Sequence, residues 1–200
     1  LARVVNVEAR QFELVEELDD NVELPVQVTI ASGFPKGDKL EFITQKVTEL
    51  GASQIWAFPA DWSVAKWDGK KLGKKVEKLE KIALGAAEQS KRNLVPSITL
   101  FEKKADFLAQ LEQFDRIVVA YEESAKEGEA AALIQTVSGL EKGAKLLFIF
   151  GPEGGLSPVE IESLKAKGAV LAGFGPRILR AETAPLYALS AVSVVTELMN

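Results

Sequence analysis

Short apolar runs alternate with amphipathic stretches along most of the chain, from residue 25 onward. The apolar runs are rich in Val, Ile and Phe, as expected of strands that are buried on both faces. Between them, apolar residues recur every three or four positions, as on one face of a helix. Strands are predicted at 26–31, 55–60, 97–101, 116–121, 146–150 and 169–174, and helices at 39–50, 69–92, 106–110, 129–137, from 158, and at 184–199. This alternation predicts an α/β domain with a mostly parallel sheet.

The first 24 residues follow a different pattern. Apolar residues gather at 4–7 and again at 12–15, which predicts two short strands around a turn. A segment of this size cannot bury a core of its own. We expect residues 1–24 to be the tail of a small β-domain whose beginning is absent, or an added edge hairpin. We expect residues 25–200 to form the main domain. The sequence does not begin with methionine, so we expect that the natural N-terminus is missing.

The stretch 145–183 carries the strongest local signals. A buried strand is followed by a glycine-rich turn at 151–155 and by a helix that should begin at Pro158, because Ser157 and Glu160 have the spacing of a capping box. The next strand also ends in a glycine-rich turn. Two such turns after buried strands predict a binding cleft at the carboxyl edge of a parallel sheet.

Composition limits the chemistry that this cleft can perform. The chain has 200 residues and contains neither cysteine nor histidine. Thiolate nucleophiles, iron–sulfur clusters, histidine bases and histidine zinc sites are therefore excluded, and proton transfer must use carboxylate, Lys, Tyr, substrate or water. The net charge of −5 gives no global reason to bind nucleic acid, although a local basic face is compatible with it. No membrane-span-length run or signal peptide is visible, which favours a cytoplasmic location.

Several motifs have more than one interpretation. Gly173-Phe174-Gly175 opens like a dinucleotide fingerprint, but Ile178 stands where the third glycine should be and no second βαβ half follows. Lysines crowd the segment 66–81 beside Trp62 and Trp67. Such a face can bind phosphates while tryptophan stacks on bases, but two glutamates dilute it, and taken alone the lysines favour a solvated helix face.

The remaining polar candidates and the last helix are also open to two interpretations. Arg92 follows a helix C-terminus, where cations are favoured, but with Gln89 it could instead point into the cleft. Arg177, Arg180 and Glu182 could form a surface ion-pair group, yet their position behind a glycine turn favours function. The helix 184–199 is apolar nearly all round, so we expect it to be a core helix, a homodimer interface, or both.

Two C-terminal motifs together resemble the RsmE family of bacterial methyltransferases, which act on N3 of a uridine in small-subunit ribosomal RNA. They are Gly-Pro-Glu-Gly-Gly at 151–155 and Gly-Pro-Arg-Ile-Leu-Arg-Ala-Glu-Thr-Ala at 175–184. The segments 45–51 and 88–92 resemble further marks of that family, in the same order. The resemblance covers about residues 25–200 and makes residues 1–24 the remnant of an N-terminal PUA-like β-barrel.

The resemblance implies a SPOUT fold, whose mostly parallel sheet carries a C-terminal trefoil knot. It also implies a homodimer, S-adenosyl-L-methionine as methyl donor, no metal, and 16S ribosomal RNA or the small ribosomal subunit as partner. Arg180 is the candidate for stabilising charge on the uracil, and Glu182 for accepting its proton or orienting Arg180. Glu153, Gln89 and Arg92 are second choices.

The binding residues follow from the same resemblance. The cofactor residues that it implies are Tyr121, Glu122, Phe150, Gly151, Pro152, Glu153, Gly154, Gly155, Gly173, Phe174, Gly175, Ile178, Leu179 and Arg180, and the substrate residues are Lys46, Gln89, Arg92 and Arg177. Without cysteine, C5 methylation through a covalent adduct is impossible, whereas N3 or ribose-oxygen methylation needs no thiol. The alternatives are another knotted RNA methyltransferase, acting on a ribose 2′-hydroxyl or another base, and a non-catalytic RNA-binding or assembly protein of the same fold.

Overall fold

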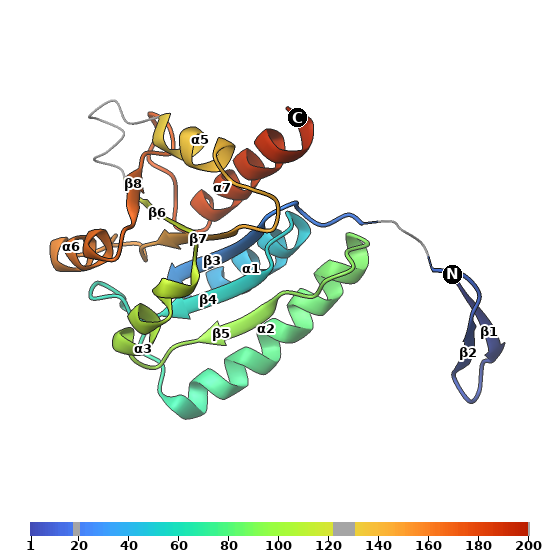
Figure 1. Cartoon of the computed structure of the whole chain (residues 1–200). Helices are drawn as coiled ribbons and strands as arrows, with labels where there is room; N and C mark the ends of the chain where they lie inside the picture. The colour runs from blue at the N-terminus through green and yellow to red at the C-terminus, as the bar shows by residue number, and fades with distance from the viewer. Residues whose placement is uncertain (18–20, 122–130, 200) are drawn as a thin grey trace.

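The computed structural model describes residues 1–17, 21–121 and 131–199. Its elements in chain order are β1 (Ala2–Asn6), β2 (Gln11–Leu14), β3 (Gln27–Gly33), α1 (Lys39–Glu49), β4 (Gln54–Phe58), α2 (Gly69–Gln89), β5 (Ser97–Leu100), α3 (Lys104–Ala109), the 3₁₀ turn η1 (Leu111–Gln113), β6 (Arg116–Ala120), α5 (Ala131–Ser138), β7 (Lys145–Phe150), α6 (Pro158–Ala166), β8 (Val170–Ala172), α7 (Ala184–Ser193) and the π-helical turn η2 (Val194–Leu198). Figure 1 shows their arrangement.

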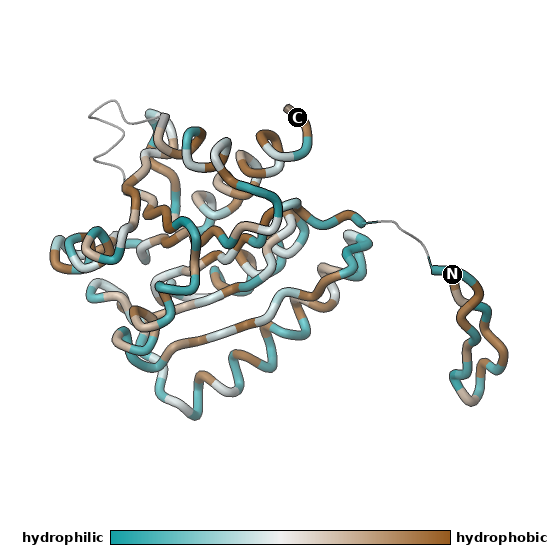
Figure 2. Tube along the Cα trace, viewed as in Figure 1, coloured by the Kyte–Doolittle hydropathy of each residue, from teal (hydrophilic) through white to brown (hydrophobic). Residues whose placement is uncertain are grey.

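Six of the described strands form one sheet in the order β5-β4-β3-β7-β6-β8, and every pairing in it is parallel. The central strand β7 is flanked on both sides, with Phe148 opposite Ile30 of β3 and Val118 of β6. The four inner strands β3, β4, β6 and β7 are buried along most of their length, as their apolar runs predict, and Figure 2 shows brown, hydrophobic tubes through the middle of the sheet. The predicted α/β class with a mostly parallel sheet is confirmed.

Alternate residues of each strand enter two different cores, because successive side chains point to opposite faces of a sheet. On one face, Ile30 and Phe148 pack with residues of α1, α5 and α7. On the other face, Ala31 and Ile149 pack with residues of α3, η1 and α6. Helix α2 packs against α1 and β5 at one end of the first face. The result is a three-layer α/β/α domain (Figure 1).

The N-terminal strands β1 and β2 form an antiparallel hairpin, with Val4 opposite Phe12. The two predicted strands around a turn are confirmed. Both of these side chains are exposed, at 65% and 74%. Figure 1 shows the hairpin standing apart from the sheet, so it adds nothing to the main core.

Local sequence signals placed most element ends within a few residues. The capping box is present, since the Ser157 hydroxyl accepts from Glu160 N–H and Glu160 accepts from Ser157 N–H at 2.9 Å. Asp38 precedes α1, but its side chain makes no capping hydrogen bond. The last helix is not one α-helix to Met199, because a π-helical turn replaces it after Ser193.

Candidate active site

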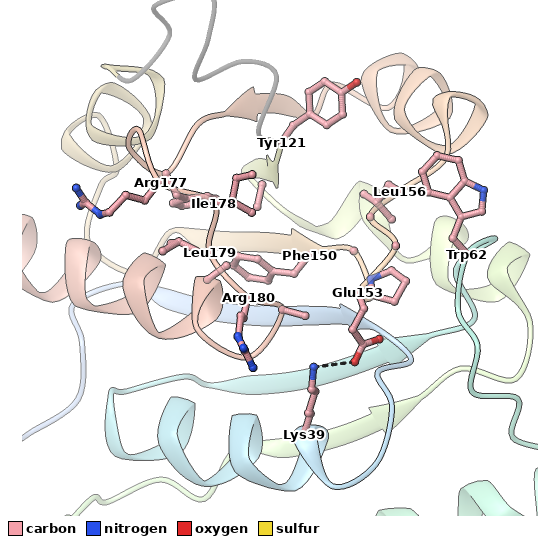
Figure 3. A pocket seen from close by; sticks show the side chains of 18 of the residues that line it. Lys39, Trp62, Tyr121, Phe150, Glu153, Leu156, Arg177, Ile178, Leu179 and Arg180 are labelled. Carbon is pink, nitrogen blue, oxygen red and sulfur yellow. Dashed lines mark ion pairs between the residues drawn. The ribbon is translucent and has the colours of Figure 1, made fainter.

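A cleft of about 800 Å³ opens at the carboxyl ends of β6 and β7 and beside the loop that follows β8 (Figure 3). Ligands bind at this edge in open parallel α/β sheets, and the volume is typical of a small-molecule site. The cleft brings together most of the predicted cofactor residues. Those that line it are Tyr121, Phe150, Gly151, Pro152, Glu153, Gly154, Gly155, Phe174, Gly175, Ile178, Leu179 and Arg180, joined by Arg177 from the substrate set.

The loop after β7 is a tight turn that requires glycine at positions 151 and 155. A Cβ on Gly151 would lie 2.6 Å from the carbonyl carbon of Gly155, and Gly155 itself has φ +79°. Gly155 N–H donates to the carbonyl of Pro152 at 2.8 Å, which closes the turn. The backbone of this loop therefore forms one wall of the cleft at close range.

The loop after β8 supplies the facing wall. Gly175 has φ +85°, a left-handed conformation that a β-branched residue adopts only with strain. The preceding residue, Phe174, is buried with its ring 5.9 Å from that of Phe150 and edge-on to Tyr187. These contacts anchor the start of the second loop to the end of β7 and to α7.

A small charge network joins the two loops to α1. The Lys39 ammonium lies 3.0 Å from Glu153 Oε1 and 3.1 Å from Glu182 Oε2, and Glu182 Oε1 lies 3.9 Å from the Arg180 guanidinium. Figure 3 shows Lys39 reaching up to Glu153 from below, with Arg180 beside it. The side chain of Glu182 is only 19% exposed, whereas that of Arg180 is 82% exposed. The network therefore leaves Arg180 at the open rim and free to contact a ligand.

The network fixes the protonation of its members. Burial alone would raise the pKa of Glu182, but its own backbone N–H and the Lys39 ammonium outweigh burial, and the pKa lies below its ordinary value. Glu153 is similar: burial opposes ionisation, while backbone N–H groups and Lys39 lower its pKa. Hydrogen bonding to Glu153 and then Glu182 raises the pKa of Lys39. All three groups are therefore charged at neutral pH.

Three predicted substrate residues do not lie in the cleft. Arg92 is at the opposite, amino-terminal edge of the strands, where its guanidinium donates to the carbonyls of Thr48 and Ala52 and to Glu23. Its side chain is 3% exposed. Gln89 is exposed near that edge, and Lys46 pairs with Glu49 on α1. The structural interpretation of Arg92 is therefore the one that its contacts support.

The last two predicted cofactor residues are Gly173 and Glu122. Gly173 is buried directly before the second loop and does not line the cleft. Glu122 lies outside the described residues. Glu182 is not part of the lining either, although Lys39 holds it immediately behind Arg180.

Two of the lining residues that the predicted site does not include, Lys39 and Trp62, carry a charged or an aromatic side chain. Lys39 is the first residue of α1, where the positive end of the helix dipole disfavours a cation, and this misplaced charge is a usable signal. Trp62 follows β4 at the carboxyl edge of the sheet and is half exposed at the rim of the cleft. Its place after a strand at the binding edge is the signal that could have found it.

Comparison with known proteins agrees with this geometry. The model of the RNA methyltransferase domain family matches residues 22–193. Ribosomal RNA small subunit methyltransferase E of Bacillus subtilis is 54% identical over 187 residues, which cover 94% of this chain and 73% of that protein. The crystal structure of a protein described as hypothetical has a TM-score of 0.87 at 50% identity, covering 94% of this chain and 74% of that one.

A further solved structure carries a ligand. Ribosomal RNA small subunit methyltransferase E of Neisseria gonorrhoeae, bound to S-adenosyl methionine, has a TM-score of 0.74 at 25% identity, covering 97% of this chain and 78% of that one. The parallel sheet, the two glycine loops and these matches define an RNA methyltransferase domain. More narrowly, the chain belongs to the ribosomal RNA small subunit methyltransferase E family.

Among the described residues, no helix is both long and apolar enough to span a membrane. No group of three or more acidic side chains in the same ranges is placed to hold a metal ion.

Proposed function

We propose that the protein transfers a methyl group from S-adenosyl-L-methionine to N3 of a uridine in 16S ribosomal RNA. The observation that carries this proposal is the placement of Arg180: an exposed guanidinium at the rim of a cleft between two glycine loops, backed by an ionised glutamate. A cation at that position can stabilise a substrate that becomes negatively charged.

The cleft fits the methyl donor in size and in lining. Apolar side chains such as Phe150 and Leu179 face it, and the glycines expose backbone groups that can hold an adenine and a ribose. S-adenosyl-L-methionine supplies an electrophilic methyl group on a sulfonium. The residues of the two loops hold that ligand and orient it toward Arg180.

Arg180 acts on the uracil. N3 carries a weakly acidic proton, and its loss leaves negative charge on the two flanking carbonyl oxygens. The guanidinium can donate hydrogen bonds to a carbonyl oxygen while it neutralises this charge. It thereby favours the deprotonated base and holds it in line for attack.

Glu182 orients Arg180 in this mechanism. Because backbone and Lys39 contacts lower its pKa, Glu182 is a poor proton acceptor at neutral pH. Its other oxygen faces Arg180. Of the two roles open to this residue, orientation is the one that the contacts support, and the uracil proton leaves to water at the open rim.

The same family membership supports the remaining features of the proposal. These are a C-terminal trefoil knot, residues 1–24 as the remnant of a PUA-like β-barrel joined to a methyltransferase domain at 25–200, and a cytoplasmic location. A homodimer is supported by the apolar surface of the last helix, where Tyr187, Val194 and Leu198 are exposed at 42%, 45% and 75%.

Product analysis tests the function directly. The protein is incubated with isotope-labelled S-adenosyl-L-methionine and either 16S transcripts or purified small subunits that lack the modification. Nucleosides are then separated and identified by mass spectrometry. We expect labelled 3-methyluridine. A 2′-O-methyl nucleoside or another methylated base would show that a related methyltransferase reaction takes place instead. Saturable cofactor binding without any product would favour a non-catalytic RNA-binding protein.

A further inference from the structure

Helix α2 carries a row of lysines that the proposed mechanism does not use. Three of its lysines have a partner: Lys71 lies 3.9 Å from Asp68, Lys78 pairs with Glu41, and Lys75 lies over the ring of Trp67. Within the described residues, the others form no ion pair. These, which we term the open lysines, are Lys66, just before the helix, and Lys70, Lys74 and Lys81 on it, all of them exposed.

The open lysines of α2 line up along one edge of the helix. At 3.6 residues per turn, residues 70, 74 and 81 fall within an arc of about 40°, and they extend over about 16 Å of helix length. Glu77 lies on the same side of the helix, about 20° outside this arc, so the row contains three cations and one anion. Like charges four residues apart destabilise a helix. A chain with a net charge of −5 that concentrates unpaired cations in this way has a local surface suited to a polyanion.

The row follows the rim of the cleft along the chain. Trp62 lines the rim of the cleft and is 49% exposed, and only residues 63–68 separate it from the start of α2. Figure 1 shows α2 starting at the edge of the sheet toward which the strand arrows point. The chain therefore leads from the tryptophan at the rim of the cleft to the first of the open lysines.

Asp61, the residue before Trp62, is anchored to α6 and α3. The Asp61 backbone N–H donates to Glu160 Oε1 at 2.9 Å, and the Asp61 carboxylate accepts from the Ser157 hydroxyl at 2.6 Å and pairs with Lys104. Glu160 is 4% exposed, so this anchor is buried. Figure 3 shows the indole at the edge of the glycine-loop wall. A half-exposed indole next to an anchored residue is a good platform for a nucleobase.

We propose that the RNA strand leaves the cleft over Trp62 and continues along the open lysines of α2. A base next to the target uridine stacks on the indole, and the ammonium groups contact successive phosphates. The chemistry is that of single-stranded RNA, because an unpaired base offers its face to the indole and the flexible backbone can follow a row of cations. This inference rests on the proposed function and deepens it by placing the substrate strand.

The lysines are tested through the salt dependence of RNA binding. The triple variant Lys70→Gln, Lys74→Gln, Lys81→Gln keeps helix-forming side chains. Its matched control removes three lysines elsewhere: Lys142→Gln, Lys145→Gln, Lys165→Gln. The affinity for a labelled, uridine-rich single-stranded RNA is measured at several salt concentrations. Each phosphate contact with single-stranded RNA contributes about −0.7 to the slope of log affinity against log salt, so the triple variant should lose about 2 from the slope. The control should keep the parent slope.

Trp62 is tested separately because stacking does not depend on charge. Trp62→Ala should weaken RNA binding by roughly 5- to 150-fold, the range for loss of one base–aromatic stack, with an unchanged salt slope. Trp62→Phe should restore most of the affinity. In methyl transfer to 16S RNA, Trp62→Ala should raise KM for RNA far more than it lowers kcat. A purely structural role would give the phenylalanine variant no advantage over alanine.

Cofactor binding separates failure of this inference from failure of the proposed function. Melting temperatures and calorimetric titration with S-adenosyl-L-methionine should match the parent in the lysine variants, because none of these lysines lines the cleft. Trp62 does line it, so the RNA affinity of the Trp62 variants is compared with the parent at saturating cofactor. If the parent binds the cofactor while the triple-lysine variant and its control give the same RNA affinity and slope, the path is wrong. The path is equally wrong if the parent binds cofactor but not RNA. A parent that binds no cofactor would instead overturn the proposed function.

Discussion

Two regions at opposite edges of the sheet each contain an arginine next to a glutamate, and they differ in what remains free. At the amino-terminal edge, Arg92 is 3% exposed, and its donors are used by Glu23 and two backbone carbonyls. At the carboxyl edge, Arg180 is 82% exposed and touches Glu182 only at 3.9 Å. The residue types are alike, but only the second arginine has donors left for a substrate.

The difference teaches that a structural arginine is separated from a functional one by how many of its hydrogen-bond donors are already used, and not by residue type. Glu23 also accepts from the backbone N–H groups of Asn93 and Leu94, so it ties the segment before β3 to the end of α2. Glu182 has its charge balanced by Lys39 and is thereby held in place behind Arg180. The pair of Arg92 and Glu23 stabilises the fold, and the pair of Arg180 and Glu182 presents a cation to the cleft.

The largest expected effect belongs to Arg180. Arg180→Ala should lower the rate of methyl transfer by roughly 10²- to 10³-fold, the usual loss when one donor to a developing negative charge is removed. Cofactor affinity should change little by comparison, and the melting temperature should remain that of the parent. Single-turnover kinetics at saturating cofactor measure the rate. Arg177→Ala serves as a control on the same loop, with an effect on KM for RNA rather than on the chemical step. A parent-like rate in Arg180→Ala would remove Arg180 from the mechanism.

Arg92→Ala should show the reverse pattern. Removing the guanidinium leaves a partly buried carboxylate and two carbonyls without their donor, so the free energy of unfolding should fall by about 3 kcal/mol. Urea denaturation measures this loss. The exposed Gln89→Ala, on the same stretch of chain, should change stability by less than about 0.5 kcal/mol. If Arg92→Ala kept its stability but lost RNA affinity, the structural interpretation of this edge would be wrong.

Lys39→Met should have a smaller effect on activity. Two ionised glutamates would then share a site without their common cation, and Glu182 would no longer be held behind Arg180. We expect methyl transfer to fall about tenfold, which corresponds to about 1.4 kcal/mol in the barrier. Lys142→Met removes an exposed lysine elsewhere and should leave the rate unchanged. Equal rates in the two variants would mean that the network has no part in placing Arg180.

The smallest effect concerns pH. The pKa values of Glu153 and Glu182 are lowered from 4.5, so the stability that they add is present above about pH 4.5 and is lost as pH falls through their lower folded values. The pKa of Lys39 is raised from 10.5, so its contribution is present below about pH 10.5 and is lost above its higher folded value.

Between these limits, we expect no change in stability from the network when thermal unfolding is followed against pH. Methyl transfer should rise with pH as uracil N3 loses its proton. A fall in rate below pH 7 that disappears in Glu182→Gln would contradict the assignment of Glu182 as an orienting residue.

Much of the fold was readable from the sequence because its strands are continuous apolar runs and its helix ends carry specific signals. The capping box before Pro158 and the glycine turn at 151–155 are local features, so their geometry follows from their own residues. The position of the cleft could be predicted from these features, because the carboxyl ends of parallel strands lie at the same edge of the sheet.

The remainder depended on distant contacts that local patterns do not encode. Lys39 reaches Glu153, which lies more than a hundred positions later in the chain, and Arg92 meets Glu23 across the amino-terminal edge. Gly33 is a similar case. A Cβ there would lie 2.5 Å from Pro152 Cδ, so the last residue of β3 must lack a side chain for the first glycine loop to pack against it. Nothing next to these residues in the sequence reveals such partners.

Calorimetric titration with S-adenosyl-L-methionine tests the central claim most directly, because the whole account depends on the cleft between the two glycine loops being the cofactor site. The parent should show saturable binding. Gly175→Val should show none, because φ +85° is strained for a β-branched residue and the loop must move. Gly85→Ala, on a helix position with open space around it, should bind like the parent. Folded Gly175→Val protein that bound the cofactor with parent affinity would contradict the account.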